Sequence, residues 1–316
     1  MKKAEVSENA SIIVSKDKKS TLQIEGDEER ITIFDDEGEV AATSSGEKAP
    51  KSTEKNKETD EETAKLVKKI PAKSADGKSG MDELNELYGL HDLKKQITKF
   101  INTVKFNQSR KEQGLKTTPI TLHSLFMGNP GTGKTTVARI LGRVLYETGV
   151  IRSNKFVEVT RKDLVAEYIG QTAPKTQKVL EQSKGGILFI DEAYTLNSGS
   201  EKDFGQEAID TILTFMEDNR DNTMIIFAGY TEEMNQFLNM NSGLKSRIPN
   251  TFYFDDYTPE EIAQIGYENL LKEDYIVDEQ KYKDIIKRLY SHSIDKSNAR
   301  WVRNINEKLI QIMANR

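Results

Sequence analysis

The sequence predicts an α/β fold in which helices sandwich a parallel sheet and a small all-α domain follows. Four short runs are almost entirely apolar, which indicates strands that are buried on both faces; they span residues 124–127, 156–160, 187–190 and 224–228. Helical spacing of apolar residues separates these runs, as expected for a parallel sheet with helical crossovers. After Pro259 the strand patterns stop, and helical periodicity covers residues 260–271, 279–290 and 299–314.

The region before residue 81 has a different composition. Around Ile24 and Ile33, apolar and polar residues alternate on either side of an acidic turn, which predicts a small β-hairpin. Residues 44–80 are rich in Lys, Glu, Ser and Thr and nearly free of large apolar side chains, so they cannot offset chain entropy by burial. The predicted parts are an acidic segment that is largely disordered or a hairpin (1–43), a flexible linker (44–80), the α/β domain (81–257) and a helical lid domain (258–316). The helical pattern runs to the last residue, which is compatible with a longer parent protein.

Composition excludes several classes of protein. The 316 residues include no cysteine and three scattered histidines, so disulfides are excluded and zinc-ligand spacing is missing. No apolar run approaches the roughly 18 residues of a membrane-spanning helix, and the N-terminus lacks the apolar stretch of a signal peptide. We therefore expect a cytoplasmic protein without membrane insertion. A net charge of −5 with well-mixed signs argues against a protein that coats nucleic acid.

The segment GNPGTGKTT, residues 128–136, matches the phosphate-loop pattern G-x-x-x-x-G-K-[ST] and lies between a predicted strand and a predicted helix. Such a loop turns backbone amides toward phosphate oxygens at a helix N-terminus. Lys134 would reach the β- and γ-phosphates of ATP, and Thr135 would hold Mg²⁺. A chance glycine-rich turn is the alternative, and the strand-to-helix context argues against it. The residues expected to bind nucleotide here are Asn129, Pro130, Gly131, Thr132, Gly133, Lys134, Thr135 and Thr136.

The segment GGILFIDEAY, residues 185–194, supplies two carboxylates at the end of an apolar strand. Ligands bind at the carboxyl ends of strands in open α/β sheets, so Asp191 is placed to act on Mg²⁺. Glu192 follows it and is the candidate for polarising the attacking water. An acidic pair that merely begins a helix is the alternative. The two motifs together predict an ATPase that depends on Mg²⁺.

Six segments in order resemble the AAA+ ATPases of the CbbX and stage V sporulation protein K type, from about Leu84 to the C-terminus. They are GNPGTGKTT, GGILFIDEAY, FGQEAIDTILTFMED, IIFAGYTEEM, NSGLKSR and NARWVRN. The resemblance implies a phosphate-loop NTPase core with a helical lid, assembled as a homo-oligomeric, hexameric ring.

The resemblance also implies roles for residues outside the two motifs. Tyr88, Gly89 and Leu90 correspond to the stretch that flanks adenine, and Arg247 to an arginine finger that enters the neighbouring subunit's site. Arg300 corresponds to the lid arginine known as sensor 2.

Two further positions stay open. Arg303 is close enough to Arg300 along the helix to be confused with it. The polar sensor that ends the fourth strand is often asparagine in this group, whereas this sequence has Tyr230, followed by Thr231. Either of the two is the sensor candidate.

Tyr168, Ile169 and Gly170 stand at the place of the pore loop in AAA+ remodelling proteins, which implies a motor that pulls on a client protein. An aromatic and a branched side chain can grip an extended polypeptide through apolar contact without requiring a sequence. An ATP-gated scaffold that threads nothing is one alternative. A nucleic-acid motor is the other, although Glu167, Gln171 and Thr172 around this stretch are not basic.

Overall fold

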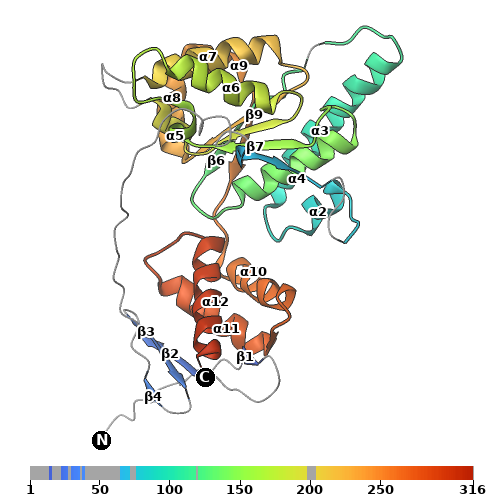
Figure 1. Cartoon of the computed structure of the whole chain (residues 1–316). Helices are drawn as coiled ribbons and strands as arrows, with labels where there is room; N and C mark the ends of the chain where they lie inside the picture. The colour runs from blue at the N-terminus through green and yellow to red at the C-terminus, as the bar shows by residue number, and fades with distance from the viewer. Residues whose placement is uncertain are drawn as a thin grey trace, which may run out of the picture. The chain divides into compact units, whose positions relative to one another are not determined.

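The computed structural model describes short strands at residues 14–15, 23–27, 30–35 and 38–39, and then residues 65–71, 76–118, 120–197 and 204–315. Its elements are labelled in Figure 1. The chain divides into two units that we describe separately. The α/β unit comprises Glu54–Asn129 and Gly133–Asp255, and the helical unit comprises Met1–Thr53, Pro130–Thr132 and Asp256–Arg316.

The α/β unit is built on a six-stranded sheet with the order β10-β6-β9-β8-β7-β5. Five strands run parallel, and β5 pairs antiparallel with β7 at one edge. The strands are β5 (Val67–Lys69), β6 (Ser124–Gly128), β7 (Lys155–Val159), β8 (Ile187–Ile190), β9 (Met224–Gly229) and β10 (Asn250–Phe254). All four predicted strands are present in this sheet, which confirms the predicted α/β class.

Helices cover both faces of this sheet (Figure 1). Alternate strand residues point to opposite faces, so Phe126 of β6 lies in one core and its neighbour Leu125 in the other. The first core includes side chains of α2, α3 and α4, and the second includes side chains of the helices α5 to α9. The helices are α2 (Gly80–Glu86), α3 (His91–Glu112), α4 (Lys134–Glu147), α5 (Arg161–Leu164), α6 (Thr172–Ser183), the 3-10 turn η1 (Ala193–Leu196), α7 (Gly205–Asp218), α8 (Thr231–Met240) and α9 (Ser242–Arg247).

The predicted linker (44–80) extends too far toward the C-terminus, because β5 and Ile70 belong to the α/β unit. Ile70 is only 4% exposed, and it lies beside Gly142 of α4 and Ile187 of β8. Its backbone donates to the carbonyl of Asn154 over 2.8 Å. The ordered structure therefore begins before the predicted boundary at residue 81. The linker residues 44–64 and 72–75 lie outside the described part of the chain.

The strand β10 was not among the predicted strands. Its alternation buries Phe252 and Phe254 and leaves Tyr253 exposed, so it lacks the continuous apolar run of the central strands. It pairs with β6 along its length, so that Phe254 lies opposite Gly128. A Cβ atom at Gly128 would collide with the backbone of Phe254, which explains why glycine ends β6.

The helical unit has a core of its own around Tyr282 and Trp301. Its three helices begin and end within two residues of the predicted bounds. The predicted hairpin is present too, with Ile24 of β2 opposite Ile33 of β3. The helices are α10 (Pro259–Lys272), α11 (Glu279–His292) and α12 (Ala299–Ala314), and the strands are β1 (Val14–Ser15), β2 (Gln23–Asp27), β3 (Arg30–Asp35), β4 (Gly38–Glu39) and β11 (Ile276–Val277). Among the described helices, none is both long and apolar enough to cross a bilayer.

Candidate nucleotide site

The phosphate loop leads from β6 into α4, whose first residue is Lys134. Gly133 precedes the helix with a φ of 94°, and among the described residues no side chain caps the helix there. The N-terminus of α4 therefore follows directly on the glycine-rich loop, where the helix dipole favours an anion. The Nζ atom of Lys134 donates to the carbonyls of Gly128 (2.7 Å) and Asn129 (2.8 Å). This geometry fits a phosphate group.

The carboxylates Asp191 and Glu192 follow β8 at the same edge of the sheet as the phosphate loop, because β6 and β8 are parallel and both pair with β9. The backbone amide of Glu192 donates to Oδ1 of Asp191 over 3.1 Å. Glu192 is exposed and adopts a left-handed conformation (φ 48°, ψ 45°), which is uncommon for a residue other than glycine. Asp191 and Thr135 carry oxygen atoms of the kind that Mg²⁺ prefers, and their role as metal ligands stays a prediction.

Two tyrosines follow the neighbouring strands β8 and β9. The ring centroids of Tyr194 and Tyr230 are 5.7 Å apart, and Nζ of Lys134 lies 6.0 Å from the centroid of the Tyr230 ring. Burial raises the pKa of Tyr194 to about 12, with a further contribution from Glu192, so its hydroxyl stays protonated at neutral pH. Tyr230 was a sensor candidate from the sequence, and Thr231 begins α8 beside it. The sequence did not indicate the contact of Tyr194 with Tyr230, because only the fold brings the two rings together.

The adenine-flanking stretch predicted from the resemblance connects α2 to α3. Gly89 and Leu90 both have left-handed φ angles, of 64° and 53°, and Tyr88 is 41% exposed. Two left-handed residues in succession turn the chain sharply before α3. The role of this stretch in binding adenine stays a prediction.

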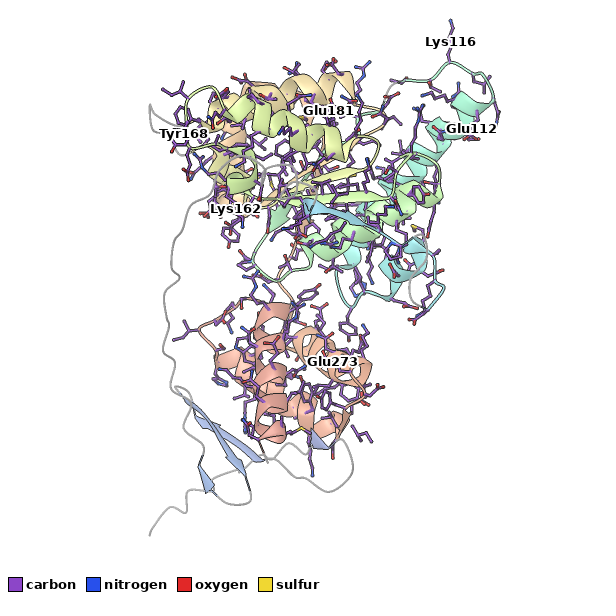
Figure 2. The ribbon with its side chains drawn as sticks, viewed as in Figure 1. Glu112, Lys116, Lys162, Tyr168, Glu181 and Glu273 are labelled. Atoms are coloured by element: carbon purple, nitrogen blue, oxygen red, sulfur yellow. The ribbon has the colours of Figure 1, made fainter. Side chains whose placement is uncertain are left out.

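Tyr168 lies on the loop between α5 and α6 of the α/β unit (Figure 2), and Ile169 follows it on the same loop. Tyr168 is 62% exposed and Ile169 86% exposed, and Gly170 has a φ of 75° with open space around it. The base of the loop is held by Lys175, whose Nζ donates to the carbonyl of Val165 over 3.0 Å. Tyr168 therefore does not pack into the core of its own domain.

Arg247 is the last residue of α9 and is partly exposed. Its Nε atom lies 3.4 Å from Oε2 of Glu217 on α7, and its guanidinium also donates to the carbonyl of Gly243 over 3.3 Å. A role in a neighbouring subunit would require Arg247 to exchange these partners for a phosphate.

Arg300 and Arg303 lie on the first turns of α12 in the helical unit, and both are exposed. Pro130–Thr132, the crest of the phosphate loop, belongs to the same unit. The backbone amide of Ala299 donates to the carbonyl of Gly131 over 3.2 Å. The backbone of Arg300 therefore lies beside this crest, whereas Arg303 lies about one turn further along the helix.

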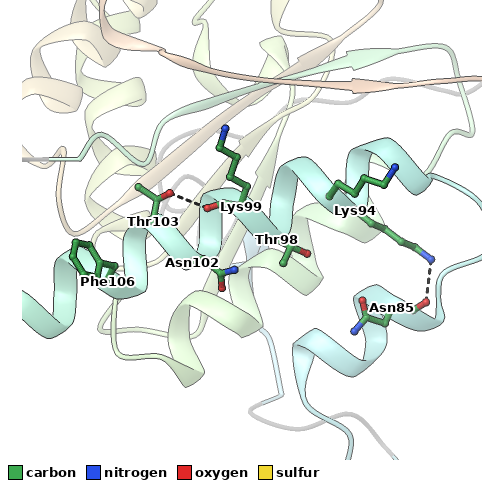
Figure 3. A pocket seen from close by; sticks show the side chains of 8 residues that line it. Asn85, Lys94, Thr98, Lys99, Asn102, Thr103 and Phe106 are labelled. Atoms are coloured by element: carbon green, nitrogen blue, oxygen red, sulfur yellow. Dashed lines mark hydrogen bonds between the residues drawn. The ribbon is translucent and has the colours of Figure 1, made fainter.

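A hollow of 720 Å³ lies on α2 and α3, and its lining includes none of the predicted site residues (Figure 3). Within it, Lys94 donates to the carbonyls of Asn85 (3.0 Å) and Leu87, and so closes the C-terminal end of α2. Thr103 bonds back to the carbonyl of Lys99 over 2.9 Å. These local bonds indicate a structural role, and we assign no ligand to this surface.

Comparison with known proteins agrees with the geometry. Residues 124–256 match the family described as "ATPase family associated with various cellular activities (AAA)". The chain is 40% identical over 293 residues to "Stage V sporulation protein K" of Bacillus subtilis (strain 168), a match that covers 91% of this chain and 90% of that protein. The chain belongs to the AAA family. As an AAA ATPase it hydrolyses ATP, and the predicted CbbX and stage V sporulation protein K type is confirmed.

Two other relatives of this AAA ATPase carry different names. One is "Ribulose bisphosphate carboxylase/oxygenase activase, chloroplastic" of Cyanidioschyzon merolae (strain NIES-3377 / 10D), 42% identical over 75% of this chain and 82% of that protein. The other is "Protein CbbX" of Cereibacter sphaeroides, 43% identical over 65% of each chain. The names of these relatives refer to different processes, sporulation and ribulose bisphosphate carboxylase/oxygenase activation, so the task of this chain has to be argued from its own residues.

Proposed function

We propose that this AAA ATPase assembles into a homo-oligomeric, hexameric ring and uses ATP to remodel or thread a client protein through a central pore. The observation that carries the proposal is the exposure of two adjacent large apolar side chains, Tyr168 and Ile169, on a loop with an anchored base. Isolated apolar residues on a surface are ordinary, but a neighbouring pair at a loop tip provides a contact surface for a polypeptide. Gly170 leaves the tip free to move.

Each residue of the nucleotide site has a separate task in hydrolysis. Lys134 and the amides at the start of α4 bind the phosphates. Glu192 takes a proton from the attacking water, because its carboxylate is exposed next to Asp191 without being a predicted metal ligand. Thr135 and Asp191 would hold Mg²⁺, which neutralises phosphate charge when bound.

Arg247 makes hydrolysis depend on assembly in this proposal. An arginine offered by the neighbouring subunit stabilises charge on the transferred phosphoryl group. Within its own chain, Arg247 pairs with a partly exposed Glu217, an interaction that solvent screens and that a phosphate can replace. Arg300 acts on the nucleotide of its own subunit, as the sensor 2 arginine of the lid.

The pore-loop sequence favours a protein client over nucleic acid. Glu167, Gln171 and Thr172 flank the exposed pair, and none of them offers the positive charge that phosphate backbones attract. The relative named as an activase of ribulose bisphosphate carboxylase/oxygenase, which is itself a protein, supports a protein client as well. We propose that the client is met in the cytoplasm.

A hydrolysis-deficient trap tests this function. Glu192→Gln should bind ATP and Mg²⁺ but hydrolyse ATP at least about 100-fold more slowly, because water activation is lost while the phosphate and metal ligands remain. Affinity capture from the native cell with ATP, followed by mass spectrometry, should then identify the client. Adding Tyr168→Ala to the trap should release that client.

Tyr253→Ala in the same trap is the matched control, because Tyr253 is a 49% exposed tyrosine outside the loop. It should leave the captured client in place. The threading proposal fails if two results occur together. The trap that carries Tyr168→Ala still holds the client, and a protein with Tyr168→Ala and an intact Glu192 remodels the client at the normal rate. An ATP-gated scaffold would then be the better account.

A further inference from the structure

Three consecutive carbonyl groups of the phosphate loop accept hydrogen bonds from the helical unit to which they belong. The carbonyl of Pro130 accepts from Nδ2 of Asn298 (3.2 Å) and that of Gly131 from the amide of Ala299 (3.2 Å). The carbonyl of Thr132 accepts from the hydroxyl of Tyr257 (3.3 Å). The crest of the loop is thus held on its carbonyl side along its whole length.

Asn298 is the centre of this arrangement. It is fully buried, and its Nδ2 atom also donates to Oδ1 of Asp256 (2.8 Å) and to the carbonyl of Lys296 (3.1 Å). Its Oδ1 atom accepts the backbone amide of Tyr257 over 2.9 Å. One side chain therefore connects the start of α12, the segment that precedes α10, and the phosphate loop.

The backbone of Asn298 shows that this position is constrained. Its φ of 54° and ψ of −133° lie in a region that glycine enters freely and other residues rarely adopt. Such a conformation persists only where the surrounding contacts impose it, and here those contacts are the hydrogen bonds of the side chain. The same turn brings Ser297 against Gly131, where a Cβ atom would collide with the Ser297 carbonyl.

A phosphate loop binds anions through its amides, so its carbonyls must point away from the ligand and find donors elsewhere. We propose that Asn298 and Tyr257 are positioning residues that hold the loop crest in its phosphate-binding shape by satisfying these carbonyls. The lid thereby sets the affinity of the loop for nucleotide, in addition to offering Arg300. This role concerns the ATPase site alone and is independent of the ring and of the client.

The chemistry of both side chains fits the role. Burial raises the pKa of Tyr257 to about 12, so its hydroxyl remains a donor at every physiological pH. Asn298 cannot titrate, and its amide offers donor and acceptor atoms at once. The bonds to the loop therefore do not depend on pH.

The test is nucleotide affinity in the full chain, measured with a fluorescent ATP analogue. Asn298→Gly suits the backbone conformation and removes only the side-chain bonds, so it should fold and bind the analogue about tenfold more weakly. Tyr257→Phe loses one donor and should weaken binding about threefold. Because both act on one loop, the double variant should lose less than the product of the two effects.

Asn306→Ala is the matched control. Asn306 is a buried asparagine of α12 whose side chain bonds to the hydroxyl of Tyr282 (2.6 Å) and the carbonyl of Gly266 (2.8 Å), both outside the phosphate loop. It should lower the unfolding temperature while leaving the dissociation constant of the analogue within twofold of the wild type. The proposal is overturned if Asn298→Gly and Tyr257→Phe are folded and bind the analogue as the wild type does. It is also overturned if Asn306→Ala weakens binding as much as Asn298→Gly.

Discussion

At the scale of single residues, His123 shows how a titratable side chain can serve the fold of an ATPase without taking part in catalysis. It is 1% exposed, its Nε2 atom lies 3.2 Å from the carbonyl of Met216, and its Nδ1 atom accepts the amide of Ile225 over 3.1 Å. The imidazole is therefore neutral, with its proton on Nε2. Protonation of Nδ1 would break the bond to β9.

This environment predicts a loss of stability in mild acid. Burial lowers the pKa of His123 from 6.5 to about 4, so the unfolded chain takes up the proton first as the pH falls below 6.5. Stability is complete above pH 6.5 and is lost progressively down to about pH 4, where the folded state protonates too. Between pH 7.5 and 5.0 we expect His123 to account for about 2 kcal/mol of lost unfolding free energy.

Denaturant unfolding at both pH values checks this prediction. The variant His123→Gln does not titrate, so its stability should fall about 2 kcal/mol less over the same pH range than that of the wild type. Equal pH dependence in the two proteins would show that His123 is not the responsible group.

The residues that we place in the nucleotide site divide into those that local sequence patterns indicate and those that such patterns do not indicate. Lys134, Asp191 and Glu192 were predictable, because their chemistry depends on local spacing next to an apolar strand. Asn298 and Tyr257 were not, because their partners are loop carbonyls more than a hundred residues away. Only the unusual backbone of Asn298 singles it out, and a sequence does not display a φ angle.

At the scale of elements, the edge strand β5 belongs to the α/β unit although it lies before the predicted boundary at residue 81. It is held by pairing with β7, by an ion pair of 3.4 Å between Lys68 and Glu158, and by the burial of Ile70 beside Gly142. Ile70 also receives a hydrogen bond from Nδ2 of Asn154 over 3.0 Å. The segment therefore contributes to the core despite its charged composition.

Two truncations separate this structure from the linker predicted by composition. A chain that starts at residue 65 keeps β5 and Ile70 and serves as the reference. A chain that starts at residue 81 loses β5 and Ile70. Its unfolding temperature should be about 5–10 °C lower than that of the chain that starts at residue 65, because loss of the buried Ile70 side chain alone lowers the unfolding free energy by about 2–4 kcal/mol. Equal unfolding temperatures for both truncations would contradict the assignment of β5 to the core.

The central strands were predictable because each is apolar on both faces, and the lid helices because their apolar residues recur at helical spacing. The edge strands β5 and β10 were not, since an edge strand buries fewer side chains and therefore carries a weaker pattern. Val67 and Ile70 among lysines, and Phe252 and Phe254 among polar residues, are too few to predict strands without their partners.

At the scale of the whole molecule, the proposed ring completes a catalytic site that takes its residues from two neighbouring subunits. In each chain, Lys134 and Glu192 lie at the sheet edge, whereas Arg247 ends α9 in an ion pair with Glu217. If hydrolysis requires Arg247 of the neighbouring subunit, an isolated subunit binds ATP but turns it over slowly. Assembly then controls the motor, and the pore loops act together only when the ring is formed.

Mixing two inactive variants tests this central claim most directly. Arg247→Ala should keep nucleotide affinity within a few-fold and lose hydrolysis by about 10³-fold, and Lys134→Ala should fail to bind nucleotide productively. In randomly mixed rings at a one-to-one ratio, about a quarter of the sites combine an intact Lys134 with an intact neighbouring Arg247, so ATPase activity should recover toward about a quarter of the wild-type rate. Co-purification of differently tagged subunits confirms that the rings are mixed. Activity that stays absent at every mixing ratio in confirmed mixed rings would contradict a site shared between subunits.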